Sequence, residues 1–266
     1  MDKDLFYPHN LRFSSERALV LAQMSALAYK PAEEISAGLK QSDHKSVFIF
    51  EKDDTEGFFS VKGRSAFLIF RGTEKNSLQD WLTDFNVKLV PCGRGKVHRG
   101  VNLALDRVWD KLENRIIEHG RGKKIWCAGH SLGGALAMLA FYRLAQSKAD
   151  LGGLYTFGQP CLGNKKFARD FNLKLRKISF RLVSEGDLTA WVPPRILNYA
   201  HCGRLIYLKS YGRSYQEDFP VKTGFDRAGK NIVKAGEYYR FLRDRFPERV
   251  KAHSLVNYLL LLKKTI

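Results

Sequence analysis

The sequence predicts an α/β protein with a mostly parallel central sheet that is covered by helices on both faces. Segments with strand-like and helical apolar spacing alternate along the second half of the chain. The strand-like segments there are continuous apolar runs, which are typical of strands buried on both sides. The 266 residues are 44% hydrophobic, which is enough for a large core. No window reaches the eighteen or so apolar residues of a membrane-spanning helix.

The first half of the chain contains two predicted helices that flank three short strands. Residues 14–30 open with a serine cap signal, and a helix there has one face formed by Val20, Met24, Leu27 and Ala28. Apolar runs with strand character follow at residues 46–50, 58–62 and 66–70. A helix at about 101–118 has one apolar stripe and stops at Gly120. The stripe consists of Val101, Leu105, Val108 and Leu112.

From residue 124 onward, strands and helices alternate regularly. Strands are predicted at 124–129, 153–158, 178–184 and 204–210, with helices at 132–146, around 164–175 and at 255–263. The stretch 211–235 is rich in glycine, basic and aromatic residues and has little periodicity. We find no internal repeat and no low-complexity linker. The sequence therefore predicts one domain, 1–266, with a basic-aromatic insert at about 211–251.

The bulk composition limits the class of protein. The chain has 45 Lys and Arg against 27 Asp and Glu, a formal charge of +18, which favours contact with a polyanion such as an anionic lipid surface or nucleic acid. The four scattered cysteines form no CxxC pair, so no metal site is predicted. The charged N-terminus lacks the apolar core of a Sec signal peptide. We therefore expect a cytoplasmic protein, or one exported by another route.

A serine elbow is the strongest chemical signal in the sequence. Gly129 to Gly133 fit the pattern G-x-S-x-G, in which a strand turns sharply into a helix and presents Ser131 at the edge of the sheet. A side chain at either glycine would collide where strand and helix pass closely. The N–H groups of a helix that starts at Leu132 would face the region above the serine and suit a developing oxyanion.

A nucleophilic serine needs a base and an acid, which follow it along the chain in this fold. Only His201 and His253 come after Ser131. His253 precedes a helix and can swing over the sheet edge, whereas His201 leads into a strand and has a structural character. Asp187, in a turn just beyond a strand, is the favoured acid because its loop can reach the imidazole. Glu185, nearer the end of the strand, is the competitor. The acid would orient the imidazole and stabilise its charged form.

Four segments in this order resemble the class 3 lipase family, the relatives of filamentous-fungal triacylglycerol lipases. They are "KVHRGV", "GHSLGGALA", "VSEGDLTAWVPP" and the late "HSLVNYL". The resemblance implies an α/β-hydrolase fold, a triad of Ser131, Asp187 and His253, and no metal or organic cofactor. It also implies an oxyanion hole formed by Thr73, in the "FRGT" motif, together with the Leu132 N–H.

The resemblance further places a lid-like segment at about 74–86. Its apolar residues have helical spacing, although a fixed core-packing helix would show the same pattern. They are Leu78, Trp81, Leu82 and Phe85. The sequence departs from the family at Ala190, where a proline is usual, and at Val101, where an aromatic residue is common. Because of these departures, the resemblance does not determine the shape of the acid loop or the wall of the acyl site.

The function predicted from these features is hydrolysis of a carboxylic ester of a lipid through an acyl-enzyme. An acylglycerol or a phospholipid would serve as substrate, and the charge favours a peripheral anionic membrane surface as a partner. A soluble-ester esterase or an acyltransferase would use the same triad. A non-catalytic binder of anionic surfaces or of nucleic acid is the alternative outside enzymes, but no nucleic-acid module is recognisable and no nucleic-acid partner is expected. The sequence leaves the oligomeric state open.

Overall fold

The computed structural model describes residues 5–6, 11–72, 88–193, 195–209, 214–217 and 251–266. The helices are α1 (Ser15–Leu27), α2 (Ala32–Gln41), α4 (Arg99–Gly120), α5 (Leu132–Gln146), α6 (Lys165–Leu175) and α9 (Leu255–Lys263). The main sheet contains β1 (Lys45–Lys52), β2 (Thr55–Lys62), β3 (Ser65–Phe70), β6 (Lys124–His130), β7 (Leu151–Phe157), β9 (Ser179–Ser184), β11 (Arg204–Leu208) and β12 (Ser214–Glu217). Short 3-10 helices lie at Arg176–Ile178, Thr189–Trp191 and Arg195–Leu197.

The main sheet is parallel at its centre and antiparallel at both ends. Its strand order is β1-β2-β3-β6-β7-β9-β11-β12. The pairs from β3 to β11 are parallel, whereas β1-β2, β2-β3 and β11-β12 are antiparallel. The carboxyl ends of β6, β7 and β9 therefore meet at one edge of the sheet, where side chains that follow these strands come together.

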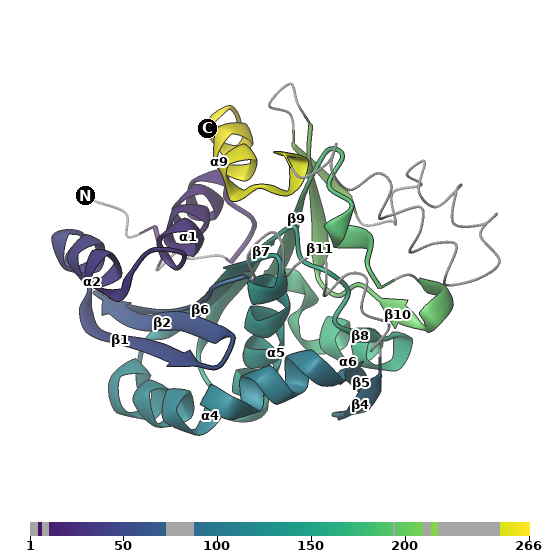
Figure 1. The fold of residues 1–266 in the computed structure, drawn as a ribbon, viewed down its shortest axis with the longest axis horizontal. Helices are drawn as coiled ribbons and strands as arrows, with labels where there is room; N and C mark the ends of the chain where they lie inside the picture. The colour runs from purple at the N-terminus through teal and green to yellow at the C-terminus, as the bar shows by residue number, and fades with distance from the viewer. Residues whose placement is uncertain (1–4, 7–10, 73–87, 194, 210–213, 218–250) are drawn as a thin grey trace.

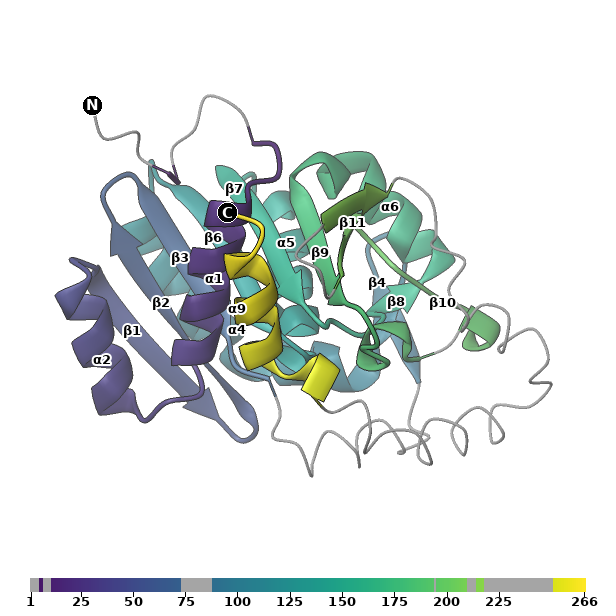
Figure 2. The ribbon, with the colours of Figure 1, turned by 90° about the horizontal axis from the view of Figure 1, so that it is seen from above.

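Helices cover both faces of this sheet. In Figure 1, α1, α2 and α9 lie above the sheet, and α4, α5 and α6 lie below it. Figure 2 shows α1 and α9 side by side, so the two ends of the chain share one layer. The two largest apolar cores lie on opposite faces of the sheet, and alternate residues of one strand enter different cores. In β6, for example, Trp126 faces α1 and Cys127 faces α5. No helix in the described ranges combines the length and apolar character needed to cross a bilayer.

The predicted elements of the main sheet and its helices are confirmed, and one helix face needs correction. The helix predicted at 132–146 is α5, and the buried stripe of α4 contains the four predicted residues. In α1, however, Val20 and Leu27 are only partly buried, whereas Leu21 and Ala22 are fully buried. The buried face is the one with small residues, because α1 packs closely on β6 and α9.

Several elements were not predicted from the sequence. Helix α2 is one of them, and β12 lies inside the stretch that showed little periodicity. A second, four-stranded sheet has the order β10-β8-β5-β4 and consists of β4 (Leu89–Cys92), β5 (Gly95–His98), β8 (Gly163–Asn164) and β10 (Tyr199–Ala200). These strands are two to four residues long, too short to show a period of two.

Candidate active site

Ser131 occupies the sharp turn between β6 and α5. Its backbone has φ 56° and ψ −129°, a conformation that a residue other than glycine rarely adopts. The turn is held by a hydrogen bond from the Ser131 N–H to the carbonyl oxygen of Phe157 (2.9 Å). A Cβ at Gly129 would lie 2.3 Å from the Gly133 carbonyl oxygen, and one at Gly133 would lie 2.5 Å from the Phe70 carbonyl oxygen. Both glycines are therefore required by the close approach of strand and helix.

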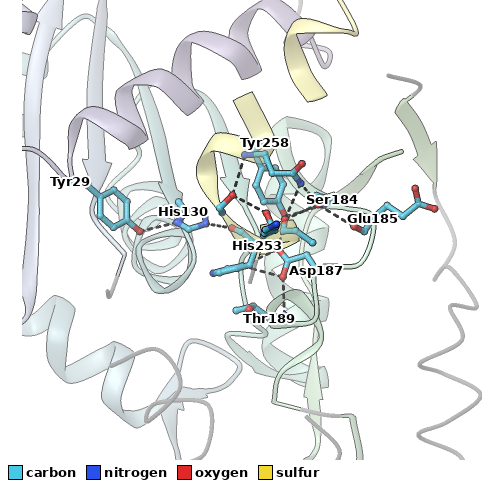
Figure 3. Close-up of polar contacts among 12 residues, drawn as sticks. Tyr29, His130, Ser184, Glu185, Asp187, Thr189, His253 and Tyr258 are labelled. Carbon is cyan, nitrogen blue, oxygen red and sulfur yellow. Dashed lines mark hydrogen bonds and ion pairs between the residues drawn. The ribbon is translucent and has the colours of Figure 1, made fainter. Parts of the chain in front are cut away.

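Asp187 and His253 form a buried hydrogen-bonded pair beside this edge (Figure 3). The His253 Nδ1 atom lies 3.1 Å from Asp187 Oδ1 and 3.0 Å from Oδ2, and it donates because a carboxylate only accepts. The Tyr258 hydroxyl donates to Oδ2 (2.7 Å), and the Thr189 N–H donates to Oδ1 (2.9 Å). The carboxylate is thus surrounded by donors on both oxygens, which fixes its orientation.

The electrostatics of this pocket favour the charged form of Asp187. Burial by itself raises the pKa of the carboxyl group. The attraction to His253, together with the hydrogen bonds from His253 and Tyr258, outweighs burial, and the pKa falls below its ordinary value. The same neighbourhood has the opposite effect on Tyr258, because burial and the adjacent carboxylate raise its pKa well above the usual range. Asp187 therefore stays ionised and Tyr258 stays a neutral donor near pH 7.

His130, next to Ser131 in the chain, holds the main chain of His253. Its Nε2–H donates to the carbonyl oxygen of His253 (2.7 Å), and its Nδ1 accepts from the Tyr29 hydroxyl (2.8 Å). The two imidazole rings lie 4.7 Å apart between centroids. Burial, and then the nearby His253, lower the pKa of His130 to about 3, so this ring is neutral. Figure 3 shows the chain of contacts from Tyr29 to His253.

A second set of bonds ties α9 and the residues just before it to the end of β9. The Ser184 hydroxyl donates to the Ala252 carbonyl oxygen (2.8 Å) and accepts from the Asn257 side-chain amide (2.9 Å). The Ser184 N–H donates to the Tyr258 hydroxyl (3.0 Å). Residue 252 precedes His253, and Ser184 lies just before the turn that carries Asp187. These bonds therefore fix the position of His253 relative to Asp187.

Gly158, just after β7, leaves the space that the pair needs. It has φ +60°, and a Cβ there would lie 2.6 Å from Asp187 Oδ2 and 2.8 Å from His253 Nδ1. Its N–H donates to the Leu182 carbonyl oxygen (3.1 Å), so the backbone is held at this distance. Any other residue at this position would push the carboxylate and the imidazole from their places.

Two polar atoms of the candidate site are available to contact a reactant. Ser131 Oγ and His253 Nε2 are buried, and neither has a hydrogen-bond partner within the described part of the chain. The Leu132 N–H, at the first position of α5, lacks an intrahelical acceptor by its position. Gly72 also lies against the serine, because a Cβ there would be 3.2 Å from Ser131 Cβ.

The predicted residues fall into three groups. Ser131, Asp187 and His253 lie at the same edge of the main sheet, following β6, following β9 and preceding α9. Glu185, the alternative acid, is exposed, and the Nε2 atom of His201, the alternative base, lies 3.3 Å from Cys161 Sγ. The oxyanion residue Thr73 and the lid-like segment lie outside the described residues. The latter includes Leu78, Trp81, Leu82 and Phe85.

Sequence reasoning missed the residues that contact the pair, among them Tyr258 and Gly158. Tyr258 lies five residues after His253 in an apolar helix, where a tyrosine is as typical of core packing as of hydrogen bonding. Because Tyr258 is completely buried, its hydroxyl needs a hydrogen-bond partner, but the sequence does not identify that partner. Gly158 ends a predicted strand, where a glycine is common in any turn. No local pattern distinguishes either residue.

Comparisons with known proteins show that this chain is similar to lipases. Residues 67–197 match the family model described as Lipase (class 3). The lipase of Rhizopus niveus is 33% identical over 171 residues, which are 59% of this chain and 42% of that protein. The lipase of Rhizomucor miehei is 29% identical over 150 residues, 53% of this chain and 40% of that protein. This chain thus spans about two fifths of the length of these relatives.

Solved structures show the same fold. The mono- and diacylglycerol lipase of Aspergillus oryzae has a TM-score of 0.72 with 21% identity, over 85% of this chain and 94% of that one. Lipase II of Rhizopus niveus has a TM-score of 0.62 with 25% identity, over 74% of this chain and 83% of that one. The resemblance to the class 3 lipases and the α/β-hydrolase fold that it implied are confirmed.

Proposed function

We propose that this chain, whose residues 67–197 match the family model of the class 3 lipases, is a serine hydrolase that cleaves carboxylic esters of lipids. The observation that carries the proposal is the buried Asp187–His253 pair, whose free Nε2 atom lies at the same sheet edge as Ser131. One solved structure with this fold is a triacylglycerol lipase whose catalytic centre is formed by a serine protease triad. The proposal treats the chain as one α/β-hydrolase domain.

In the proposed mechanism Ser131 is the nucleophile. His253 Nε2 removes the hydroxyl proton as Oγ attacks the ester carbonyl carbon, and the same nitrogen then protonates the leaving alcohol. Asp187 holds the Nδ1–H tautomer and stabilises the imidazolium that forms. Water, activated by His253, then attacks the acyl-enzyme and releases the fatty acid. Each step uses only this chain, the ester and water.

The proposed oxyanion hole consists of the Leu132 N–H and the Thr73 backbone N–H and hydroxyl. Leu132 opens α5, so its N–H has no intrahelical acceptor and lies at the positive end of the helix dipole. Thr73 directly follows Gly72, whose contact with Ser131 supports the second half of this hole. Removing one donor of this kind typically costs about 3 kcal/mol of transition-state stabilisation.

The proposed substrate is a lipid ester, either an acylglycerol or a phospholipid. Relatives of this chain include enzymes named as lipases and as a secreted mono- and diacylglycerol lipase. The lid-like segment 74–86 carries Leu78, Trp81, Leu82 and Phe85, and we assign this apolar face to the lipid interface. Transfer of one such side chain from water into lipid contributes about 1.5–3 kcal/mol. A soluble-ester esterase would need no such face.

The test is release of fatty acid from lipid dispersions by the unchanged protein and by Ser131→Ala. We expect release from diacylglycerol or from phosphatidylglycerol vesicles, and its loss in the variant. Ser147→Ala, at the exposed end of α5, is the matched control and should retain activity. Labelling by a fluorophosphonate should depend on Ser131 as well. Hydrolysis that persists in Ser131→Ala would refute the assignment of the nucleophile.

The same experiment separates the other candidate functions. Turnover of a short water-soluble ester without turnover of any dispersed lipid would indicate an esterase. Transfer of the acyl group to an added alcohol in preference to water would indicate an acyltransferase. A chain that neither reacts with the fluorophosphonate nor cleaves any ester would be a binding protein on a hydrolase fold.

A further inference from the structure

A group of basic side chains surrounds the first two turns of α6, and the proposed lipase activity does not use it directly. Lys165, Lys166 and Arg169 are exposed on the helix. Arg94 and Lys96 are exposed on the β4-β5 hairpin. We call these five residues the α6 basic patch.

Contacts between hairpin and helix bring the two halves of the patch together. A Cβ at Gly95, between the two hairpin cations, would lie 2.1 Å from the backbone nitrogen of Phe167 in α6. The Lys96 N–H donates to the side chain of Asn164, which also caps the helix (3.1 Å). The hairpin therefore lies directly against the start of α6, and its two cations extend the positive surface of the helix.

The patch lacks compensating negative charge. The only acidic residue between 162 and 181 is Asp170, which is buried and accepts hydrogen bonds from Tyr142 and Lys174. Arg94 approaches its carboxylate only to 3.9 Å, while its own side chain is 84% exposed. Among the described residues, none forms an ion pair with Lys165, Lys166 or Arg169. The exposed charged side chains of this helix are therefore all cationic.

Helix stability does not explain this charge. Lys165 and Lys166 occupy the first turn of α6, where the helix dipole is positive and where acidic residues would stabilise the helix. Farther along the same exposed stripe, at four-residue steps from Lys165 and Arg169, Leu173 is 74% exposed. Cations that surround an exposed apolar side chain are typical of surfaces that contact anionic lipid.

The position of the patch fits a role at the substrate interface. Helix α6 connects β7 to its parallel neighbour β9, so it begins beyond the carboxyl end of β7. Ser131 and Asp187 follow β6 and β9 at that same edge. A surface bound through the start of α6 would therefore lie on the side of the sheet that carries the candidate site.

We infer that the α6 basic patch binds the headgroups of an anionic phospholipid bilayer and orients the candidate site toward it. The inference rests on the proposed function, because a lipid substrate favours a bilayer over a nucleic acid as the anionic partner. Each cation near an anionic bilayer strengthens binding about fivefold. Removing three should weaken it roughly a hundredfold at low salt, and added salt should weaken the unchanged protein as well.

The test measures partition onto vesicles with Ser131→Ala as the parent protein, so that lipid is not consumed. The patch variant carries Lys165→Gln, Lys166→Gln and Arg169→Gln. The control variant carries Lys40→Gln, Lys52→Gln and Arg121→Gln, three exposed cations on other elements, and has the same net charge. Vesicles of phosphatidylcholine with and without phosphatidylglycerol are compared, and circular dichroism checks the fold. Because no hydrolysis is measured, failure of the proposed activity would not alter this result.

We expect the patch variant to lose about a hundredfold in partition onto anionic vesicles and the control variant to lose less than tenfold. Leu173→Ser should weaken binding a further few-fold. Equal losses in both variants would show that bulk charge is responsible and would overturn the inference. So would unchanged binding by the patch variant, or a loss of single-stranded RNA binding without a loss of vesicle binding.

Discussion

Gly158→Ala is expected to abolish most ester hydrolysis at a modest cost in stability. The new Cβ would lie 2.6 Å from Asp187 Oδ2, whereas ordinary contact begins at 3.4 Å, so the carboxylate has to move by about 0.8 Å. The His253 Nδ1 atom, 2.8 Å from the same Cβ, has to move as well. The hydrogen bond from the Gly158 N–H to Leu182 limits how far the backbone can retreat.

Two effects contribute, and they differ in magnitude. An alanine at φ +60° has a strained backbone, which costs about 1–2 kcal/mol of folding free energy. Misplacing a catalytic group by about 1 Å lowers the rate roughly a hundredfold. We therefore expect kcat/KM on a short soluble ester to fall about a hundredfold, mainly through kcat, because the displaced groups are those that transfer the proton.

Gly122→Ala separates strain from collision. Gly122 has φ +71°, and a Cβ there would meet nothing within 4 Å. Both variants should lose similar stability in urea unfolding, but only Gly158→Ala should lose activity. If the two variants have the same activity, the close packing of Gly158 on the Asp187–His253 pair does not matter for catalysis and the reasoning is refuted.

Three further variants probe the hydrogen bonds around His253. Tyr258→Phe removes a donor to Asp187 and should lower the free energy of unfolding in urea at pH 7 by about 1.5–3 kcal/mol. Because the substitution raises the Asp187 pKa, the variant should lose less stability than the unchanged protein on acidification below about pH 4. The same loss in both proteins would contradict this prediction. His130 takes up a proton near pH 6.5 when unfolded but only near 3 when folded. The contribution of neutral, buried His130 to the free energy of unfolding is therefore fully present above pH 6.5. It is lost as the pH falls below 6.5, by about 1.4 kcal/mol per pH unit. In His130→Gln, the urea midpoint should therefore change less between pH 7 and pH 5 than in the unchanged protein. An equal change in both proteins would contradict the prediction. Tyr29→Phe should cost about 0.5–1.5 kcal/mol and lower kcat, since the His253 carbonyl is held less firmly, and equal stability and kcat would show that Tyr29 plays no part.

Much of the fold was predictable because its signals are local. Continuous apolar runs marked β6, β7 and β9, and the helical stripe of α4 extended over enough turns to be unambiguous. The short strands of the second sheet gave no such signal, since two to four residues contain no measurable period. Helix α2 was missed although it is amphipathic, because its buried residues number only two.

The candidate site divides in the same way. The glycines around Ser131, and the order of serine, acid and histidine along the chain, are properties of the sequence by itself, and they led to Ser131, Asp187 and His253. The partners of that set were decided only by the tertiary structure. His130 reaches the His253 carbonyl across 123 residues of chain, and Tyr258 reaches Asp187 across 71. Such contacts depend on strand order and on how α9 packs against β9. Periodicity reports which face of an element is buried, but not which distant polar group that face will meet.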